Sequence, residues 1–148
     1  MIRPDSPEWV AAKAEGDRAE IAVARWFKSR GFDPYQSVDD AAIDLLLQCF
    51  VEVKHDRKAL QTGNVAIETH YRRQPSGLLT SPAQWWAIVI GSEAVICETP
   101  RLREFVLSGD FRECPAGDGK LATVRLVPLE NLKGWAGPNR VIALELGE

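Results

Sequence analysis

The first patterned segment of the chain predicts one long helix. Ser6 and Pro7 combine a hydroxyl N-cap with a proline at the first helical position. A helical pattern follows them to residue 30, before Gly31 ends it. With side chains placed at about 100° per residue, Glu20 falls in the middle of the apolar stripe, close to Phe27. A carboxylate on a buried face is unfavourable by several kcal/mol unless positive charge compensates it.

After this helix the pattern becomes that of short strands separated by turns. Gly91 marks the turn of an expected hairpin, and Pro100 marks the start of a second helix. The order of elements predicts one domain of mixed α/β class with one sheet. Strands are expected at 33–37, 42–47, 50–54, 65–71, 85–90, 94–99, 123–129 and 141–146, helices at 81–85, 100–108 and 129–132, and loops at 55–64, 72–80 and 114–120.

The strand at 50–54 carries two charges within an apolar run. Side chains alternate along a strand, so Glu52 and Lys54 share one face and Val51 and Val53 share the other. The valine face suits packing against a helix. The charged face therefore needs another explanation.

The turn before this strand decides which acid lies opposite Glu52. A two-residue turn at 48–49 would set Asp44 against Val53, whereas a three-residue turn at 47–49 would set Asp44 against Glu52. The segment lacks the Asn-Gly or Gly-rich pair that two-residue turns prefer. We therefore expect the odd-length turn, which brings Asp44, Glu52 and Lys54 to one face.

Composition narrows the classes of protein that fit. The chain has 148 residues, the size of one domain, and no apolar run long enough for a membrane span. Its N-terminus has no signal-peptide layout, and three cysteines without metal-site spacing indicate reduced thiols, so a cytoplasmic location is expected. The net charge is -3, so a nucleic-acid partner requires local basic charge. Residues 53–81 are locally basic, although a solvated loop would have the same composition.

The acids and the lysine together suggest a metal site. If Glu20, Asp44, Glu52 and Lys54 converge, one amine neutralises one of three carboxylates. The remaining charge favours a divalent cation, and oxygen ligands favour Mg²⁺ or Mn²⁺ over zinc. Such a cation can polarise a phosphoryl oxygen, and Lys54 can orient the attacking water or stabilise developing charge. This is the chemistry of phosphodiester hydrolysis.

Asp44, seven intervening residues and then Glu52-Val53-Lys54, with Glu20 on the preceding helix, resembles the PD-(D/E)XK nuclease superfamily. That superfamily includes restriction endonucleases, Holliday-junction resolvases and phage recombination nucleases. The resemblance covers about residues 15–90 and implies an αβββαβ core around a central mixed sheet. It implies metal ligation by Asp44, Glu52 and the Val53 carbonyl, catalysis by Lys54, and a helix acid at Glu20 that is a further candidate ligand.

The segment after Lys54 extends the resemblance to small phage-type members. They share a Gly-Asn turn, an acid-bearing strand and a Pro-Ser-Gly loop, found here between residues 62 and 86. On this likeness Glu68 is a further candidate metal ligand, although an exposed strand face explains it equally well. Candidate nucleic-acid contacts are Arg57, Lys58, Asn64, Arg72, Arg73, Ser76 and Thr80.

These observations predict a metal-dependent deoxyribonuclease acting on branched, replication or recombination DNA. A non-catalytic nucleic-acid-binding or assembly module on the same fold is the alternative, and a protein interaction domain without a nucleic-acid role is a third hypothesis. By analogy with resolvases, a homodimer is expected. One domain is expected over 1–148, with a core at about 6–110 and a C-terminal elaboration at about 111–148.

Overall fold

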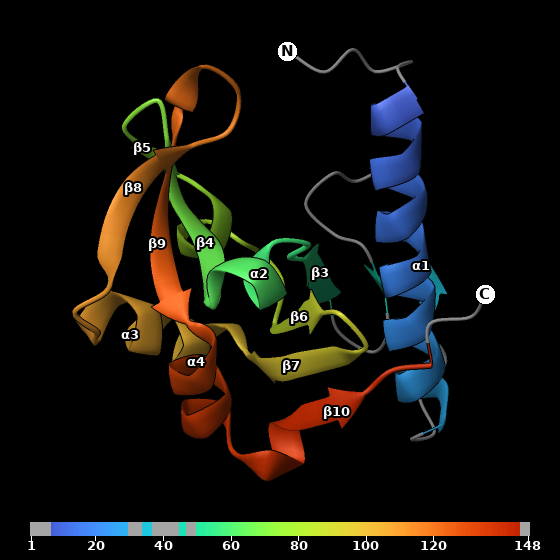
Figure 1. Ribbon diagram of the computed structural model, residues 1–148. Coiled ribbons are helices and arrows are strands. Elements are labelled where there is room, and N and C mark those ends of the chain that lie inside the picture. Colours follow the sequence, from blue (N-terminus) through green and yellow to red (C-terminus); the bar gives the residue numbers. More distant parts are fainter. Residues whose placement is uncertain (1–6, 30–33, 37–44, 47–49, 146–148) are drawn as a thin grey trace.

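The protein has a mixed α/β fold with two sheets and one long helix, shown in Figure 1. The computed structural model describes residues 7–29, 34–36, 45–46 and 50–145. In chain order the elements are α1 (Pro7–Ser29), β1 (Tyr35–Gln36), β2 (Leu45–Leu46), β3 (Phe50–His55), α2 (Ala59–Thr62), β4 (Asn64–Tyr71), β5 (Gln74–Pro75), η1 (Gly77–Leu79), β6 (Trp85–Ile90), β7 (Glu93–Glu98), α3 (Thr99–Ser108), β8 (Arg112–Ala116), η2 (Asp118–Lys120), β9 (Ala122–Pro128), α4 (Leu129–Ala136), η3 (Pro138–Arg140) and β10 (Val141–Ala143).

The larger sheet is mixed and has the strand order β1-β2-β3-β6-β7-β10. Strands β3 and β6 run parallel, and the other neighbours are antiparallel. The second sheet has the order β5-β4-β9-β8 and is antiparallel throughout. The expectation of a single sheet was therefore wrong. Alternation predicted β4 and β9 as strands, but their pairing joins segments far apart in the sequence and leaves no local signal.

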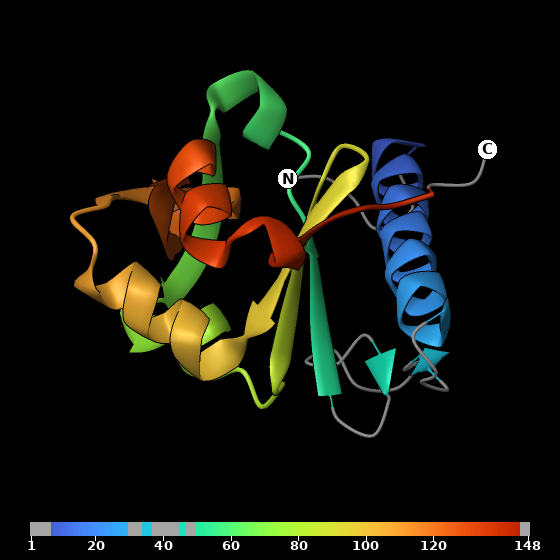
Figure 2. The same cartoon turned by 90° about the horizontal axis from the view of Figure 1, so that it is seen from below.

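The larger sheet has α1 on one side and the second sheet with α3 and α4 on the other, as Figure 2 shows from below, and an apolar cluster lies on each side. On one side, α1 packs on a cluster that includes Val51, Ala87, Val89 and Ile96 of the sheet. On the other side, the sheet shares a larger core with the second sheet, α3 and α4. Residues after 110 supply β8 and β9 to the second sheet and β10 to the edge of the larger one.

The link between β3 and β6 departs from the expected order of elements. The αβββαβ core requires a helix before the fourth strand, and a short helix was predicted at 81–85. Residues 81–84 are not helical, and β6 begins at Trp85. The Ser81 hydroxyl accepts hydrogen bonds from the Ala83 N–H (3.4 Å) and the Trp86 indole N–H (3.1 Å), so it closes a local turn instead of capping a helix. The specific restriction-endonuclease-like core is not confirmed.

All three predicted loops contain regular structure, and the loop expected at 72–80 includes β5 and η1. The loop expected at 55–64 includes the one-turn helix α2, and β8 extends into the loop expected at 114–120. Other elements were predicted correctly in type, including α1, the β6–β7 hairpin and α3. Among the helices described, none is both long enough and apolar enough to cross a membrane.

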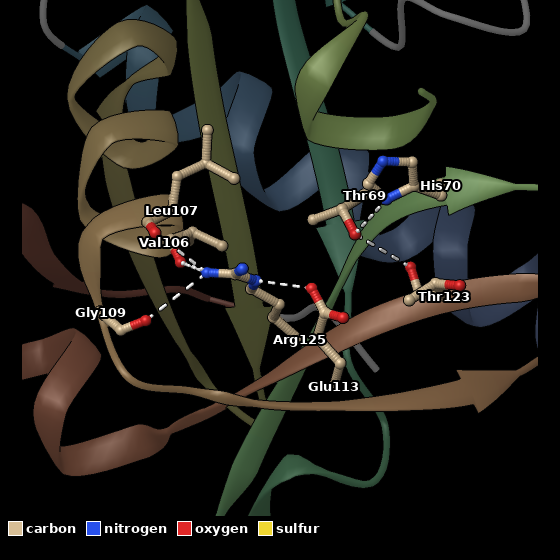
Figure 3. A network of polar contacts seen from close by, with 8 residues as sticks. All are labelled: Thr69, His70, Val106, Leu107, Gly109, Glu113, Thr123 and Arg125. Carbon is tan, nitrogen blue, oxygen red and sulfur yellow. Dashed lines mark hydrogen bonds and ion pairs between the residues drawn. The ribbon is translucent and has the colours of Figure 1, made fainter. Parts of the chain in front are cut away.

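Arg125 of β9 connects the second sheet to the C-terminal end of α3, as Figure 3 shows. Its guanidinium donates to the carbonyl oxygens of Val106 at 2.7 Å and Leu107 at 3.1 Å, and more weakly to Gly109 at 3.5 Å. It also pairs with Glu113 of β8 at 3.2 Å. The last carbonyls of a helix have no partner within the helix, so a cation placed there satisfies them.

Candidate functional site

Strand β3 follows the turn that the sequence predicted. Leu46 pairs with Phe50 and Leu45 with Val51, so three residues, 47–49, separate the paired positions. This register confirms the odd-length turn. Asp44 itself, the acid predicted to lie opposite Glu52, is outside the described residues.

The two faces of β3 are divided as predicted. Val51 is fully buried and Val53 is partly buried, and both belong to the cluster beneath α1. Glu52 and Lys54 alternate with them and therefore project on the opposite face. There they are in register with Trp86 and Ile88 of β6, which belong to the core shared with the second sheet.

Lys54 lies in a partly protected position beside that core. Both Glu52 and Lys54 are partly buried. Within the described part of the chain, the Lys54 ammonium forms no ion pair. Lys54 is in register with Ile88 of β6, and a partly buried lysine interacts more strongly with an approaching anion than one in bulk water.

Glu20 was predicted to lie in the middle of the buried face of α1. In the structure it lies at the edge of that face. The buried positions of the helix are Ala19, Ala22, Val23 and Phe27, whereas Glu20 is partly exposed. Glu20 is turned about 60° from Val23 around the helix axis. The buried face of α1 extends from Phe27 past Val23 to Ala19 and Ala22, so its centre lies to one side of Glu20.

The described residues do not by themselves establish the predicted convergence of acids. Helix α1 packs on the valine face of β3, whereas Glu52 and Lys54 project from the other face. In the part of the chain that the structure describes, no three Asp, Glu, His or Cys side chains form a group suited to a metal ion. The predicted donor set includes Asp44, which lies outside the described residues.

Glu68 is held in a defined position by the Pro-Ser-Gly loop. The Ser76 hydroxyl donates to the Glu68 carboxylate at 2.7 Å, and the Ser76 N–H donates to the Thr69 carbonyl at 2.9 Å. A Cβ on Gly77 would lie 2.5 Å from the Glu68 carbonyl oxygen, so only glycine fits there. The β4–β9 ladder is irregular between Glu68 and His70, a feature that often redirects side chains near functional sites.

The same loop is anchored to α3 and to the core. Leu78 is fully buried, and the Arg103 guanidinium donates twice to its carbonyl oxygen, at 3.2 and 3.1 Å. The Ser76 hydroxyl is already hydrogen-bonded to Glu68, whereas Thr80 is exposed. The loop holds Glu68 in place, and Thr80 remains accessible from solvent.

The basic candidates differ in their surroundings. Arg57 forms a salt bridge with Glu15 of α1, with Nε and Oε2 2.6 Å apart. The Asn64 amide donates to the Thr62 carbonyl at 2.9 Å, which closes the turn between α2 and β4. Lys58 is exposed. Arg57 and Asn64 therefore have structural partners that the sequence did not reveal.

Arg72 and Arg73 form the turn between β4 and β5, and both are exposed. Their φ angles are +49° and +66°. Positive φ at both central residues is the signature of a type I′ turn. These two arginines are thus fixed at a hairpin tip by a backbone conformation that arginine rarely adopts.

Asp56 is a positioning residue that the sequence pattern did not single out. It follows β3 directly, and its N–H donates to the Val89 carbonyl of β6 at 2.9 Å. Its carboxylate accepts from the N–H of Lys58 at 3.1 Å and from the N–H of Ala66 in β4 at 2.9 Å. Asp56 therefore joins both sheets two residues after Lys54. An Asp shortly before a helical segment was the available signal.

Comparison with known proteins identifies no relative: no family model, curated protein or solved structure matches this chain.

Proposed function

We propose that this protein is a metal-dependent deoxyribonuclease that hydrolyses phosphodiester bonds. The observation that carries the proposal is the arrangement of β3. Its valines pack beneath α1, while Glu52 and an ammonium without an ion pair among the described residues, that of Lys54, project together from the other face. An acid and an amine at this spacing resemble the E-x-K part of the PD-(D/E)XK motif, and a divalent cation beside them would supply the chemistry of phosphodiester hydrolysis.

The cation would be held by the carboxylates of Asp44 and Glu52 and by the Val53 carbonyl, with Glu68 as a further candidate ligand. Glu20 lies on α1, which covers the valine face of β3, so it is not included in this set. Carboxylate and carbonyl oxygens suit Mg²⁺ or Mn²⁺. When bound, the cation supplies Lewis acidity toward the phosphate and lowers the pKa of water. The three-residue register at 47–49 supports the inclusion of Asp44, because the prediction that pairs it with Glu52 depends on that register.

Lys54 orients the attacking water and balances negative charge that builds on the phosphate oxygens. The water oxygen forms a bond to phosphorus, and one phosphorus–oxygen ester bond breaks. The water loses one proton and the leaving oxygen gains one, so the products are a phosphomonoester and a free hydroxyl. Glu68, fixed by Ser76, is available for a second water or ligand position.

The test is cleavage of supercoiled, linear and branched DNA across a titration of Mg²⁺ and Mn²⁺. Asp44→Asn and Lys54→Ala are each expected to abolish cation-dependent cleavage. Lys28→Ala and Asp110→Asn, which change exposed charged residues outside the candidate site, are the matched controls and are expected to cleave normally. Equal cleavage by all variants would indicate a contaminating nuclease and refute the proposal.

A non-catalytic nucleic-acid-binding module is the second candidate. It is favoured by the exposed arginine turn at Arg72 and Arg73, which needs no metal site. This candidate predicts salt-sensitive DNA binding by the wild type without cleavage of any substrate. A homodimer is proposed by analogy with resolvases, and a cytoplasmic location is proposed from the reduced cysteines. Sedimentation of the protein with and without branched DNA tests the dimer.

A further inference from the structure

The residues with positive φ point to a second functional surface. In the described part of the chain, the residues other than glycine with positive φ are Arg72 (+49°), Arg73 (+66°) and Lys120 (+54°). This backbone region crowds the side chain, and glycine, asparagine and aspartate usually occupy it. All three positions are instead cationic. Turn chemistry alone gives no reason for this choice.

The two turns that contain these residues are neighbours in space. The Arg72 N–H donates to the Leu121 carbonyl at 2.9 Å, and Tyr71 is in register with Ala122. Figure 1 shows both hairpin ends together at the top of the second sheet. Cations distant in sequence are thus brought to one end of the molecule.

Exposed apolar side chains accompany the cations. Tyr71 is 45% exposed and Leu121 is 39% exposed. Tyr71 is the last residue of β4, and Leu121 directly precedes β9. The Arg72 guanidinium carbon lies 5.6 Å from the centroid of the Tyr71 ring, within cation–π range. We call Tyr71, Arg72, Arg73, Lys120 and Leu121 the hairpin-tip surface.

The charges of the hairpin-tip surface are available to a partner. Among the described residues, the side chains of Arg73 and Lys120 form no ion pair or hydrogen bond, and both residues are exposed. Asp118, in the loop between β8 and β9 that also contains Lys120, is an acid close in sequence to these cations and offsets one of the three positive charges. A cluster of three cations on a protein with net charge -3 is a local basic site against an acidic background.

We propose that the hairpin-tip surface binds duplex DNA, with Arg72, Arg73 and Lys120 on backbone phosphates and Tyr71 and Leu121 against the sugars of a groove. Guanidinium groups match phosphate geometry, and an adjacent aromatic ring and aliphatic side chain suit the apolar edge of the deoxyribose. The choice of DNA as the polyanion rests on the proposed function. Binding at this surface, however, requires neither a metal ion nor Lys54.

The test replaces the two central residues of the turn between β4 and β5. Asn-Gly is the preferred sequence for a type I′ turn, so Arg72→Asn with Arg73→Gly removes two charges while relieving the backbone. This double variant is expected to melt several degrees higher than the wild type and to bind a duplex of about 30 base pairs at least tenfold more weakly. Binding is measured by fluorescence anisotropy in EDTA, so that cleavage plays no part.

Two further double variants serve as controls. Arg72→Lys with Arg73→Lys keeps the charge and is expected to retain most of the affinity. Arg18→Gln with Lys28→Gln removes two exposed charges from α1 and is expected to bind within twofold of the wild type. The slope of log affinity against log salt should become shallower by about 2 for the Asn-Gly variant, because each phosphate that a cation neutralises contributes roughly one to the slope.

Equal weakening in the Asn-Gly and α1 variants would show a net-charge effect and overturn the proposal. So would binding of the wild type to vesicles of anionic lipid in preference to the duplex. Loss of cleavage in Lys54→Ala with intact duplex binding leaves the hairpin-tip surface in place. Conversely, cleavage in the wild type with unchanged binding by the Asn-Gly variant refutes only the hairpin-tip surface.

Discussion

Replacement of Asp56 by alanine is expected to destabilise the fold, because its carboxylate joins β3, α2 and β4. The substitution removes two acceptors, one for the Ala66 N–H at 2.9 Å and one for the Lys58 N–H at 3.1 Å. The bond to Ala66 is partly buried, and a hydrogen bond to a charged group contributes about 1.5–3 kcal/mol. The bond to Lys58 is exposed and contributes less, about 0.5–1 kcal/mol.

The free energy of unfolding should therefore fall by roughly 2–3 kcal/mol, after discounting for solvent around Asp56. For a domain of this size each kcal/mol lowers the melting temperature by about 2–4 °C, which gives a fall of roughly 4–12 °C. Asp56→Asn keeps one oxygen acceptor but turns an amide N–H toward a backbone N–H, so an intermediate loss is expected. Urea unfolding followed by tryptophan fluorescence measures both variants.

Asp110→Ala is the matched control, because Asp110 is exposed, and its unfolding free energy should stay within about 0.5 kcal/mol of the wild type. If Asp56→Ala also stays within that range, the carboxylate does not hold the sheets together. The position of Lys54 would then depend on the strand pairing of β3 alone.

Three other substitutions or measurements test single features of the structure. Arg125→Met should cost about 2–3 kcal/mol in urea unfolding, because the last carbonyls of α3 lose their charged donor; a loss below about 0.5 kcal/mol would refute that capping role. Burial raises the pKa of the Cys97 thiol from 9.0 to about 12 in the folded protein. The contribution of the neutral thiol to the free energy of unfolding is therefore fully present below pH 9 and declines as the pH rises toward 12. Iodoacetamide at a pH of about 8, mapped by mass spectrometry, should modify Cys114 and spare Cys97; modification of both at one rate would contradict the burial. Gly77→Ala should lower the melting temperature and free the carboxylate of Glu68, because its Cβ would lie 2.5 Å from the Glu68 carbonyl oxygen; an unchanged melting curve would show that the loop adjusts at no cost.

Local patterns predicted those features of the fold that depend on neighbouring residues. Helix α1 was expected at 7–30 and runs from Pro7 to Ser29, because proline at the first position and apolar spacing act within one helix. The β6–β7 hairpin turns at Gly91, which has φ +58°. The second sheet was missed because the pairing of β4 with β9 depends on contacts between distant segments.

In the candidate site, too, the features set by neighbouring residues were predictable and those set by long-range packing were not. Alternation correctly separated Val51 and Val53 from the charged face, and the absence of a tight-turn sequence correctly favoured the three-residue turn. The rotation of α1 on the sheet is set by packing, so the position of Glu20 at the edge of the buried face was not predictable from the helix alone. The roles of Asp56 and of the turn at Arg72 likewise depend on partners far along the chain.

We propose that the hairpin containing Glu52 holds a divalent cation. Binding is measured by isothermal titration of Mn²⁺ into the protein without DNA, with Glu52→Gln and Asp44→Asn as variants and Asp110→Asn as the control. The wild type and the control are expected to bind Mn²⁺ alike, and each site variant is expected to bind at least tenfold more weakly. Equal Mn²⁺ affinity in the wild type and in Glu52→Gln would contradict the proposal.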